Sequence, residues 1–145
     1  MLSEYLKGNI NFQDEVSSWQ ESIKVAAQPL LEKGCINEEY VQAMIDNVHE
    51  NGSYMVIVPG FAMPHAKSKE NVMETSMSFL KLEEPVIYPE GKEVDMHIVL
   101  AAKDDSKHLD LMSNLATILS DEEIKEKFEN VESEEELIKL IKTVE

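Results

Sequence analysis

The chain has 145 residues, which suits a single domain spanning residues 1–145. Its 13 basic residues, all of them lysine, stand against 29 acidic residues, so the formal net charge is −16 and nucleic acid is excluded as a partner. The single Cys35 excludes an internal disulfide and a multi-cysteine zinc site. No apolar run approaches the roughly 18 residues of a membrane span and no secretory signal is visible, so we expect a cytoplasmic protein without membrane insertion.

The first third of the sequence predicts one short strand and two helices. Residues 9–12 are expected to form an edge strand. Apolar residues recur every three or four positions from residue 14 to residue 33, which indicates an amphipathic helix, and Pro29 is expected to kink its last turn. Asn37 is a suitable N-cap for a second helix, which Gly52 is expected to end.

Three strands are predicted in the middle of the chain. Residues 54–58 form a continuous apolar run, which is typical of a strand buried on both faces. Residues 75–82 place apolar side chains between small polar ones and predict a second strand. Residues 83–92 contain two prolines and a glycine and predict a loop with turns. Residues 94–102 predict the central strand of the sheet.

Three helices are predicted in the last third. The first has three candidate N-caps in residues 104–106, and the second is a short acidic helix over residues 121–128. Ser133 and Glu136 form a capping box that opens the third. The element order is roughly β-α-α-β-β-β-α-α-α, which predicts an α/β fold, a three-layer α-β-α sandwich around a mixed β-sheet.

The four histidines differ in their predicted surroundings. His49 falls in the last turn of the second helix, where a surface residue is expected. His97 lies in the middle of the central strand, where we expect a partly buried ring with its hydrogen bonds satisfied. His65 follows a predicted strand, on a turn stiffened by two prolines and a glycine. Such a turn is either a rigid mount for a nucleophile or a turn that merely contains a histidine.

His108 adds a second group with a possible role in chemistry. With Ser106 as N-cap, His108 would lie in the first turn of a helix, where free N–H groups and the positive end of the dipole favour an anion, above all phosphate. The dipole favours a neutral imidazole, whereas Asp104 and Asp105 favour the charged form. The candidate phosphate-binding residues near the two histidines are Ser106, Lys103, Lys107 and Lys67, although the lysines could equally be solvated surface charges.

Two kinds of chemistry could use histidines in this way. Metal ligation is not supported by any ligand spacing, so no metal and no other cofactor is expected. Phosphoryl transfer requires only a neutral imidazole that attacks phosphorus, positioned beside groups that stabilise the charge. The sequence lacks a nucleotide-binding GxxxxGK[ST] loop, so the phosphate is expected to arrive on another protein.

Two segments resemble a known family. Residues 58–66 (Val-Pro-Gly-Phe-Ala-Met-Pro-His-Ala) and residues 104–109 (Asp-Asp-Ser-Lys-His-Leu) are similar to the two site segments of the mannitol/fructose-type enzyme IIA domains. These domains are the EIIA type-2 components of the bacterial phosphoenolpyruvate-dependent sugar phosphotransferase system (PTS). Within the family, the sequence of residues 54–65 is most similar to the ascorbate-type subgroup.

The resemblance implies a phosphotransferase component with a phosphohistidine intermediate. His65 would accept a phosphoryl group from the histidine phosphocarrier protein and pass it to a cysteine of enzyme IIB, while enzyme IIC imports the substrate. His108 would stabilise the phosphoryl oxygens. The reacting ring nitrogen and any homo-oligomer are left open, and a regulatory interaction module is the alternative function. Phe61, Met63 and Met112 are candidates for an apolar docking patch, or for the core.

The chain departs from the family at one point. Mannitol-type members carry an arginine near the end of the second helix, close to the site, and this chain contains no arginine. A bidentate clamp on phosphate is therefore unavailable, and we expect Lys103, Lys107 or Lys67 to act as a point charge instead.

Overall fold

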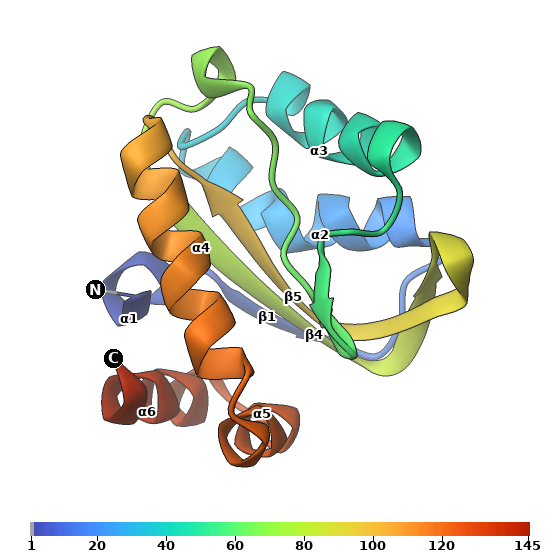
Figure 1. Cartoon of the computed structure of the whole chain (residues 1–145). Helices are drawn as coiled ribbons and strands as arrows, with labels where there is room; N and C mark the ends of the chain where they lie inside the picture. Colours follow the sequence, from blue (N-terminus) through green and yellow to red (C-terminus); the bar gives the residue numbers. More distant parts are fainter. Residues whose placement is uncertain (1) are drawn as a thin grey trace.

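Five strands form one mixed sheet in the order β1-β4-β5-β3-β2 (Figure 1). The computed structural model of the chain describes residues 2–145. The long strands β4 and β5 pair in antiparallel fashion at the centre, β1 lies parallel to β4, β3 lies parallel to β5, and β2 closes a hairpin with β3. The strand bounds are Ile10–Gln13 (β1), Val56–Val58 (β2), Gly60–Ala62 (β3), Ser76–Tyr88 (β4) and Lys92–Ala101 (β5).

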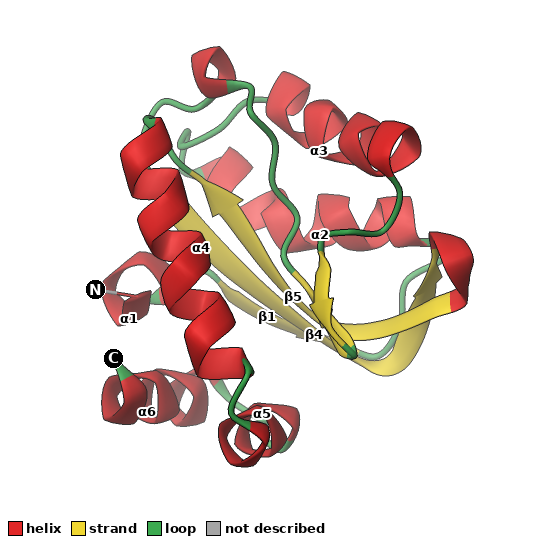
Figure 2. Ribbon diagram, in the orientation of Figure 1, coloured by secondary structure: helices red, strands yellow, loops and turns green. Residues whose placement is uncertain are grey.

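Helices cover both faces of this sheet (Figure 2). One face packs against α2 and α3, and the other packs against α4 together with α1, α5 and α6. The predicted α/β sandwich with a mixed sheet is therefore confirmed. The α-helix bounds are Leu2–Leu6 (α1), Trp19–Glu32 (α2), Glu38–Asn51 (α3), Asp105–Leu119 (α4), Glu122–Glu129 (α5) and Glu134–Val144 (α6), and two 3₁₀ turns cover Lys69–Asn71 (η1) and Pro89–Gly91 (η2).

The sheet divides the core into two clusters because side chains alternate along each strand. In β5, Ile98 and Leu100 point toward α4, whereas Val99 and Ala101 point toward α2 and α3. All four are fully buried, which agrees with the prediction of a central strand. The hydrophobic contacts on both faces fix the position of the end of β5, after which α4 begins.

The apolar run at residues 54–58 is not a strand buried on both faces. Only Val56–Val58 is extended, these residues are half-buried, and β2 lies at the edge of the sheet. Gly60 then turns the chain back into β3 with a φ of 83°, a conformation that favours glycine. An apolar run does not by itself distinguish a central strand from an edge hairpin, because both can pack against helices.

The predicted loop at residues 83–92 is also incorrect. β4 continues to Tyr88 through a shift in register between Lys81 and Val86, and η2 leads directly into β5. Pro85 lies within this shift, where the absence of an N–H donor does not break the ladder. The strand near residues 9–12 is confirmed as β1 at the opposite edge, but α1 before it was not predicted. α2 continues through Pro29 to Glu32.

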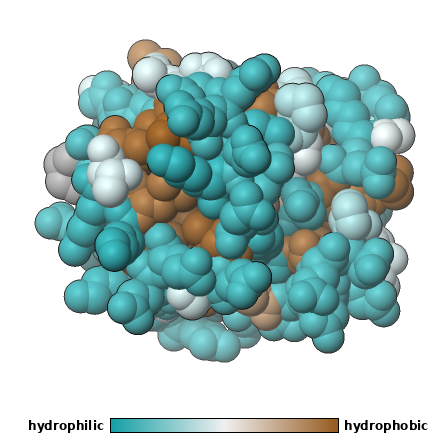
Figure 3. Space-filling view, turned by 90° about the horizontal axis from the view of Figure 1, so that it is seen from below, coloured by the Kyte–Doolittle hydropathy of each residue, from teal (hydrophilic) through white to brown (hydrophobic). Residues whose placement is uncertain are grey.

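The two ends of the described chain lie side by side (Figure 1). Ser3 in α1 donates a hydrogen bond from Oγ to Oε1 of Glu145, at 2.5 Å. Seen from below, the surface is mainly hydrophilic, with apolar side chains showing between the polar ones (Figure 3). None of the helices within residues 2–145 combines the length and the apolar character that a membrane crossing requires.

Candidate active site

His65 lies on a segment whose backbone is held from two sides. The segment follows β3, and Leu100 in β5 donates its N–H to the carbonyl of Pro64 at 3.0 Å. On the other side, Asn47 in α3 donates a side-chain N–H to the carbonyl of His65, also at 3.0 Å. The side chain of His65 is 5% exposed. The two prolines therefore act together with tertiary hydrogen bonds to hold this residue.

Tyr40 ties the same segment to the rest of the fold. Its hydroxyl donates to the carbonyl of Leu100 at 2.7 Å and accepts from the N–H of Ala66 at 3.2 Å. Burial raises the pKa of Tyr40 to about 12, so the hydroxyl stays protonated and able to donate. The residue after His65 is thus anchored to both α3 and β5.

The ring of His65 is held in one tautomer. Its Nδ1 lies 2.7 Å from the carbonyl oxygen of Met63, and a carbonyl can only accept, so Nδ1 carries the proton. Burial lowers the pKa of His65, which keeps the ring neutral near pH 7. Nε2 therefore presents an unprotonated lone pair, which is the form of the ring that can act as a nucleophile.

A network from α3 reaches this lone pair. Asn47 donates from Nδ2 to the hydroxyl oxygen of Tyr54 at 2.8 Å, and its Oδ1 accepts from Nδ2 of Asn51 at 2.8 Å. The Tyr54 hydroxyl lies 3.4 Å from Nε2 of His65, and the two rings meet edge to face. Neither Tyr54 nor Asn47 was among the candidates from the sequence, because no local pattern marks them.

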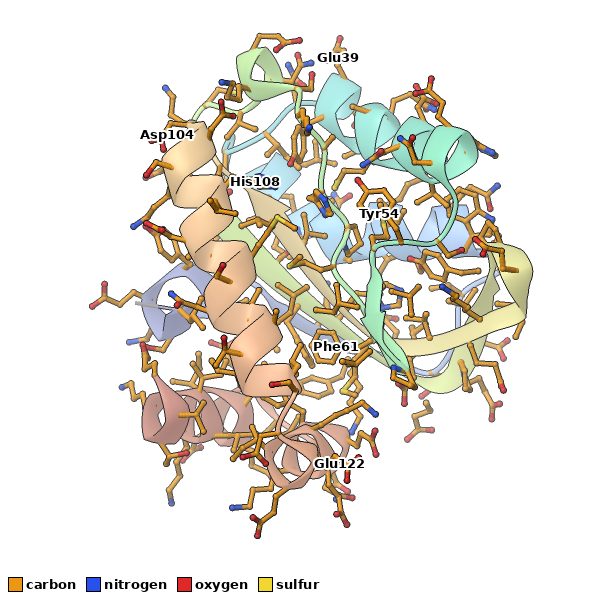
Figure 4. The ribbon with its side chains drawn as sticks, in the orientation of Figure 1. Glu39, Tyr54, Phe61, Asp104, His108 and Glu122 are labelled. Carbon is orange, nitrogen blue, oxygen red and sulfur yellow. The ribbon has the colours of Figure 1, made fainter. Side chains whose placement is uncertain are left out.

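His108 lies next to His65. The ring centroids are 5.2 Å apart, and Figure 4 shows His108 and Tyr54 on opposite sides of the segment that rises from β3. The side chain of His108 is half-buried. Its pKa is lowered by burial and then by the neighbouring His65, so both rings are neutral near pH 7. A neutral His108 can donate one N–H toward a group held by His65.

The helix that carries His108 begins earlier than expected. Asp104 is the N-cap of α4 in place of Ser106, and it accepts the N–H of Lys107 at 2.7 Å. The N–H of His108 is bonded to the carbonyl of Asp104 at 3.1 Å and is not free to bind an anion. His108 therefore faces the site with its ring and not with its backbone.

The structure separates the other phosphate-binding candidates. Lys67 lines the groove around the two histidines. Lys107 does not, since its Nζ lies 5.6 Å from the centre of the Tyr5 ring, against α1. Lys103 and Ser106 are exposed at the start of α4 and lie outside the groove lining. Of the four candidates, only Lys67 is brought to the histidines.

The groove itself has a volume of about 830 Å³ and mixed walls. Met112 contributes an apolar side chain from α4 to this groove and also packs against the core cluster below α4, so it fits both alternatives from the sequence. Phe61 and Met63 are buried in the core instead and belong to no exposed patch. Asp46 and Glu50 on α3 make the opposite wall acidic. Lys67 is therefore the one lysine among the described residues that line this groove.

The remaining histidines lie elsewhere. His49 is exposed at the end of α3, edge-on to Trp19, as expected for a surface residue. His97 is fully buried, and neither ring nitrogen has a hydrogen-bond partner within the described chain, contrary to the expected satisfied ring. Burial lowers the pKa of His97 to about 3. Within residues 2–145, no cluster of three or more His, Cys, Asp or Glu side chains could hold a metal ion.

Comparison with known proteins identifies relatives along the whole chain. The profile of the family described as "Phosphoenolpyruvate-dependent sugar phosphotransferase system, EIIA 2" matches residues 5–144. The chain is 35% identical over 142 residues to the mannitol-specific cryptic phosphotransferase enzyme IIA component of Escherichia coli (strain K12), with 97% of each chain covered. It is 32% identical over 136 residues to the ascorbate-specific PTS system EIIA component of the same strain, with 92% and 88% covered.

Solved structures share the fold. The solution structure of the mannitol-specific cryptic phosphotransferase enzyme IIA from Escherichia coli superimposes with a TM-score of 0.87 and 34% identity, with 97% of each chain covered. A complex of enzyme IIAMTL and phosphorylated enzyme IIBMTL from Escherichia coli matches with a TM-score of 0.80 and 26% identity, with 93% of this chain and 94% of that chain covered. The arrangement of sheet and helices is therefore shared by the relatives.

Proposed function

This chain belongs to the EIIA 2 family of the phosphoenolpyruvate-dependent sugar phosphotransferase system, and we propose that His65 is the residue that carries its phosphoryl group. EIIA components act as phosphotransferases in that system. The observation that carries the proposal is the state of the His65 ring, with Nδ1–H bonded to Met63 and the Nε2 lone pair unprotonated. A nucleophile for phosphorus needs this arrangement and little further chemistry from the protein.

The transfer is a displacement at phosphorus. The donor is the phosphohistidine of the histidine phosphocarrier protein. The Nε2 lone pair of His65 forms the new N–P bond while the N–P bond of the donor breaks, and the donor nitrogen keeps the electron pair. The proton on Nδ1 does not move, because the Met63 carbonyl holds it. The phosphorylated ring is therefore positively charged, which offsets the negative phosphoryl oxygens.

The same ring then serves as a leaving group. When a cysteine thiolate of enzyme IIB attacks phosphorus, the N–P bond of His65 breaks and Nε2 recovers its lone pair. The ring returns to the neutral Nδ1–H tautomer without gaining or losing a proton. A group that needs no proton transfer in either direction suits a reversible relay.

His108 and Lys67 are the proposed stabilising groups. The ring of His108 has its centroid 5.2 Å from that of His65, and in its neutral form it donates one N–H to a phosphoryl oxygen held on His65. Lys67 supplies a positive charge at the rim of the groove, in place of the arginine that this chain lacks. A lysine acts as a point charge and not as a bidentate clamp, so the imidazole carries more of the directional hydrogen bonding.

The proposed acceptor is a cognate enzyme IIB, and the proposed imported substrate is of the ascorbate type. Enzyme IIAMTL from Escherichia coli was solved as a complex with phosphorylated enzyme IIBMTL, which supports this class of acceptor. The similarity of residues 54–65 to the ascorbate-type subgroup supports this substrate class. Over the whole chain, the ascorbate-type and cryptic mannitol-type relatives have similar identities, 32% and 35%. Mixing the phosphorylated protein with enzyme IIB of each type distinguishes them, and an ascorbate-type enzyme IIB is expected to be labelled faster. A regulatory module would label neither.

Replacement of His65 tests the phosphoryl acceptor. With labelled phosphoenolpyruvate, enzyme I and the histidine phosphocarrier protein, the wild-type protein is expected to gain one acid-labile, base-stable phosphoryl group. His65→Ala removes the proposed attacking nitrogen and should abolish the label. His49→Ala replaces an exposed histidine outside the groove and should be labelled like the wild type. Undiminished labelling of His65→Ala refutes the proposal.

A further inference from the structure

The hydroxyl group of Tyr54 lies close to the proposed nucleophilic nitrogen. It lies 3.4 Å from Nε2 of His65, at the nitrogen that faces away from Met63. The Tyr54 side chain is 50% exposed at the mouth of the groove, and its ring stands at 88° to that of His65. Any group attached to Nε2 must therefore pass close to this hydroxyl.

Asn47 determines which way the Tyr54 hydroxyl points its hydrogen. The carbonyl of His65 can only accept, so the atom of Asn47 that faces it is the amide nitrogen. The same nitrogen donates its second hydrogen to the Tyr54 oxygen, and Oδ1 accepts from Asn51. Because Tyr54 accepts from Asn47, its own hydrogen is left to point toward His65.

We propose that Tyr54 is a further catalytic residue, whose hydroxyl donates a hydrogen bond to the phosphoryl group on His65, and that Asn47 is the positioning residue that aims it. In the unphosphorylated protein, the hydroxyl faces the Nε2 lone pair. Formation of the N–P bond uses that lone pair, and the nearest acceptors for the hydroxyl are then phosphoryl oxygens. This inference rests on the proposed function, because it requires a phosphoryl group on Nε2.

The composition of the groove gives such a donor a specific role. The chain has no arginine, and the α3 wall next to Tyr54 carries Asp46 and Glu50. These carboxylates repel a phosphoryl dianion, while Lys67 is the one lysine among the described lining residues. A neutral hydroxyl that is already aimed at the reacting atom adds a hydrogen bond and needs little reorganisation during transfer.

The test compares Tyr54→Phe with Tyr5→Phe. Each substitution removes only a hydroxyl, and Tyr5 lies against Lys107, outside the groove. Phosphoramidate is used as the phosphoryl donor so that docking of a partner protein plays no part. Nε2 displaces ammonia from phosphorus, and ammonia leaves with the electron pair of the broken P–N bond. The rate of label incorporation on His65 is measured in both variants and in the wild type.

Tyr54→Phe is expected to slow incorporation by about tenfold or more. The effect should stay smaller than the ~10²–10³-fold loss for a fully buried oxyanion donor, because Tyr54 is half exposed. The phosphoryl group of the labelled variant should also titrate at a higher pH by phosphorus NMR, because a donated hydrogen bond favours the dianion. Tyr5→Phe should match the wild type in both measurements. A wild-type rate and titration in Tyr54→Phe overturn the inference. A wild-type protein that gains no label on His65 from the histidine phosphocarrier protein overturns the proposed function.

A double-mutant cycle tests the part of Asn47. If Asn47 acts through the Tyr54 hydroxyl, Asn47→Ala should slow incorporation much less in the Tyr54→Phe background than in the wild type. If the rate loss of the double variant equals the product of the two single losses to within about twofold, the two residues act independently and the positioning role is overturned.

Discussion

At the scale of single residues, the same imidazole behaves differently in two surroundings. His65 and His108 face a groove, and burial lowers the pKa of both rings without removing them from reactants. His97 is fully buried on the α2 side of the sheet, with the Tyr88 ring 5.9 Å away between centroids. Neither of its ring nitrogens has a hydrogen-bond partner within the described residues. Sequence position identifies a histidine, but its protonation depends on what packs around it.

His108 should affect the rate at which His65 is phosphorylated but not which residue carries the phosphoryl label. His108→Ala removes the proposed N–H donor, and we expect phosphorylation of His65 by phosphoramidate to slow by about 10²–10³-fold, as for one donor to an oxyanion. Asn114→Ala, an exposed change on the same helix, serves as the control and should react at the wild-type rate. Equal rates for His108→Ala and the control would remove His108 from the mechanism.

His97 should make the fold sensitive to acid. Burial lowers the pKa of His97 to about 3, whereas the pKa of a histidine in the unfolded chain is about 6.5. Between these values the unfolded chain binds more protons, so stability is lost as the pH falls. From pH 7 to pH 5 this group alone accounts for a loss of about 2 kcal/mol in the free energy of unfolding.

His97→Leu tests this linkage by urea unfolding at the two pH values. The variant lacks the titrating ring and should lose about 2 kcal/mol less than the wild type over this pH interval. The explanation fails if the wild type and His97→Leu lose the same stability between pH 7 and pH 5.

At the scale of elements, the start of α4 places His108 beside His65. Asp104 caps the helix by accepting the backbone N–H of Lys107, and His108 then lies on the turn that faces the groove. Lys69 in η1 forms an ion pair with Asp105 at 3.2 Å and joins the segment after His65 to the same helix end. Both side chains of that pair are largely exposed, so the ion pair contributes little to stability and the cap contributes more.

Removal of the cap should therefore be measurable. Asp104→Ala leaves the N–H of Lys107 without its side-chain acceptor, and we expect the free energy of unfolding in urea to fall by about 1 kcal/mol. Asp110→Ala removes the same charge from an exposed position further along α4 and should change stability by less than about 0.5 kcal/mol. Equal stabilities of the two variants would show that the cap is not needed.

Errors in the predicted elements have a common physical origin. The sequence predicts the helices well where a cap begins an apolar stripe, as at Asn37 and Ser133, because these signals are local. It misplaces the apolar run at residues 54–58 and the proline-containing segment after residue 82. The order and depth of strands in a sheet depend on which segments pair, and pairing is a long-range property.

At the scale of the whole molecule, sheet topology brings the site together. β3 and β5 are parallel neighbours, so their carboxyl ends lie at the same edge of the sheet. His65 follows the first strand and His108 lies on the helix after the second, and their ring centroids are 5.2 Å apart at that edge. α3 covers the neighbouring face and contributes Asn47 to the same place.

The sequence by itself determined the residue types, the helix caps and the two segments that carry His65 and His108, because these depend on neighbours along the chain. Only the tertiary structure decided that Nδ1 of His65 is bonded to Met63, that Lys67 but not Lys107 reaches the groove, and that the Tyr54 hydroxyl lies 3.4 Å from Nε2 of His65. These facts concern side chains from separate elements, whose distances are set by strand pairing and packing and by no spacing in the sequence.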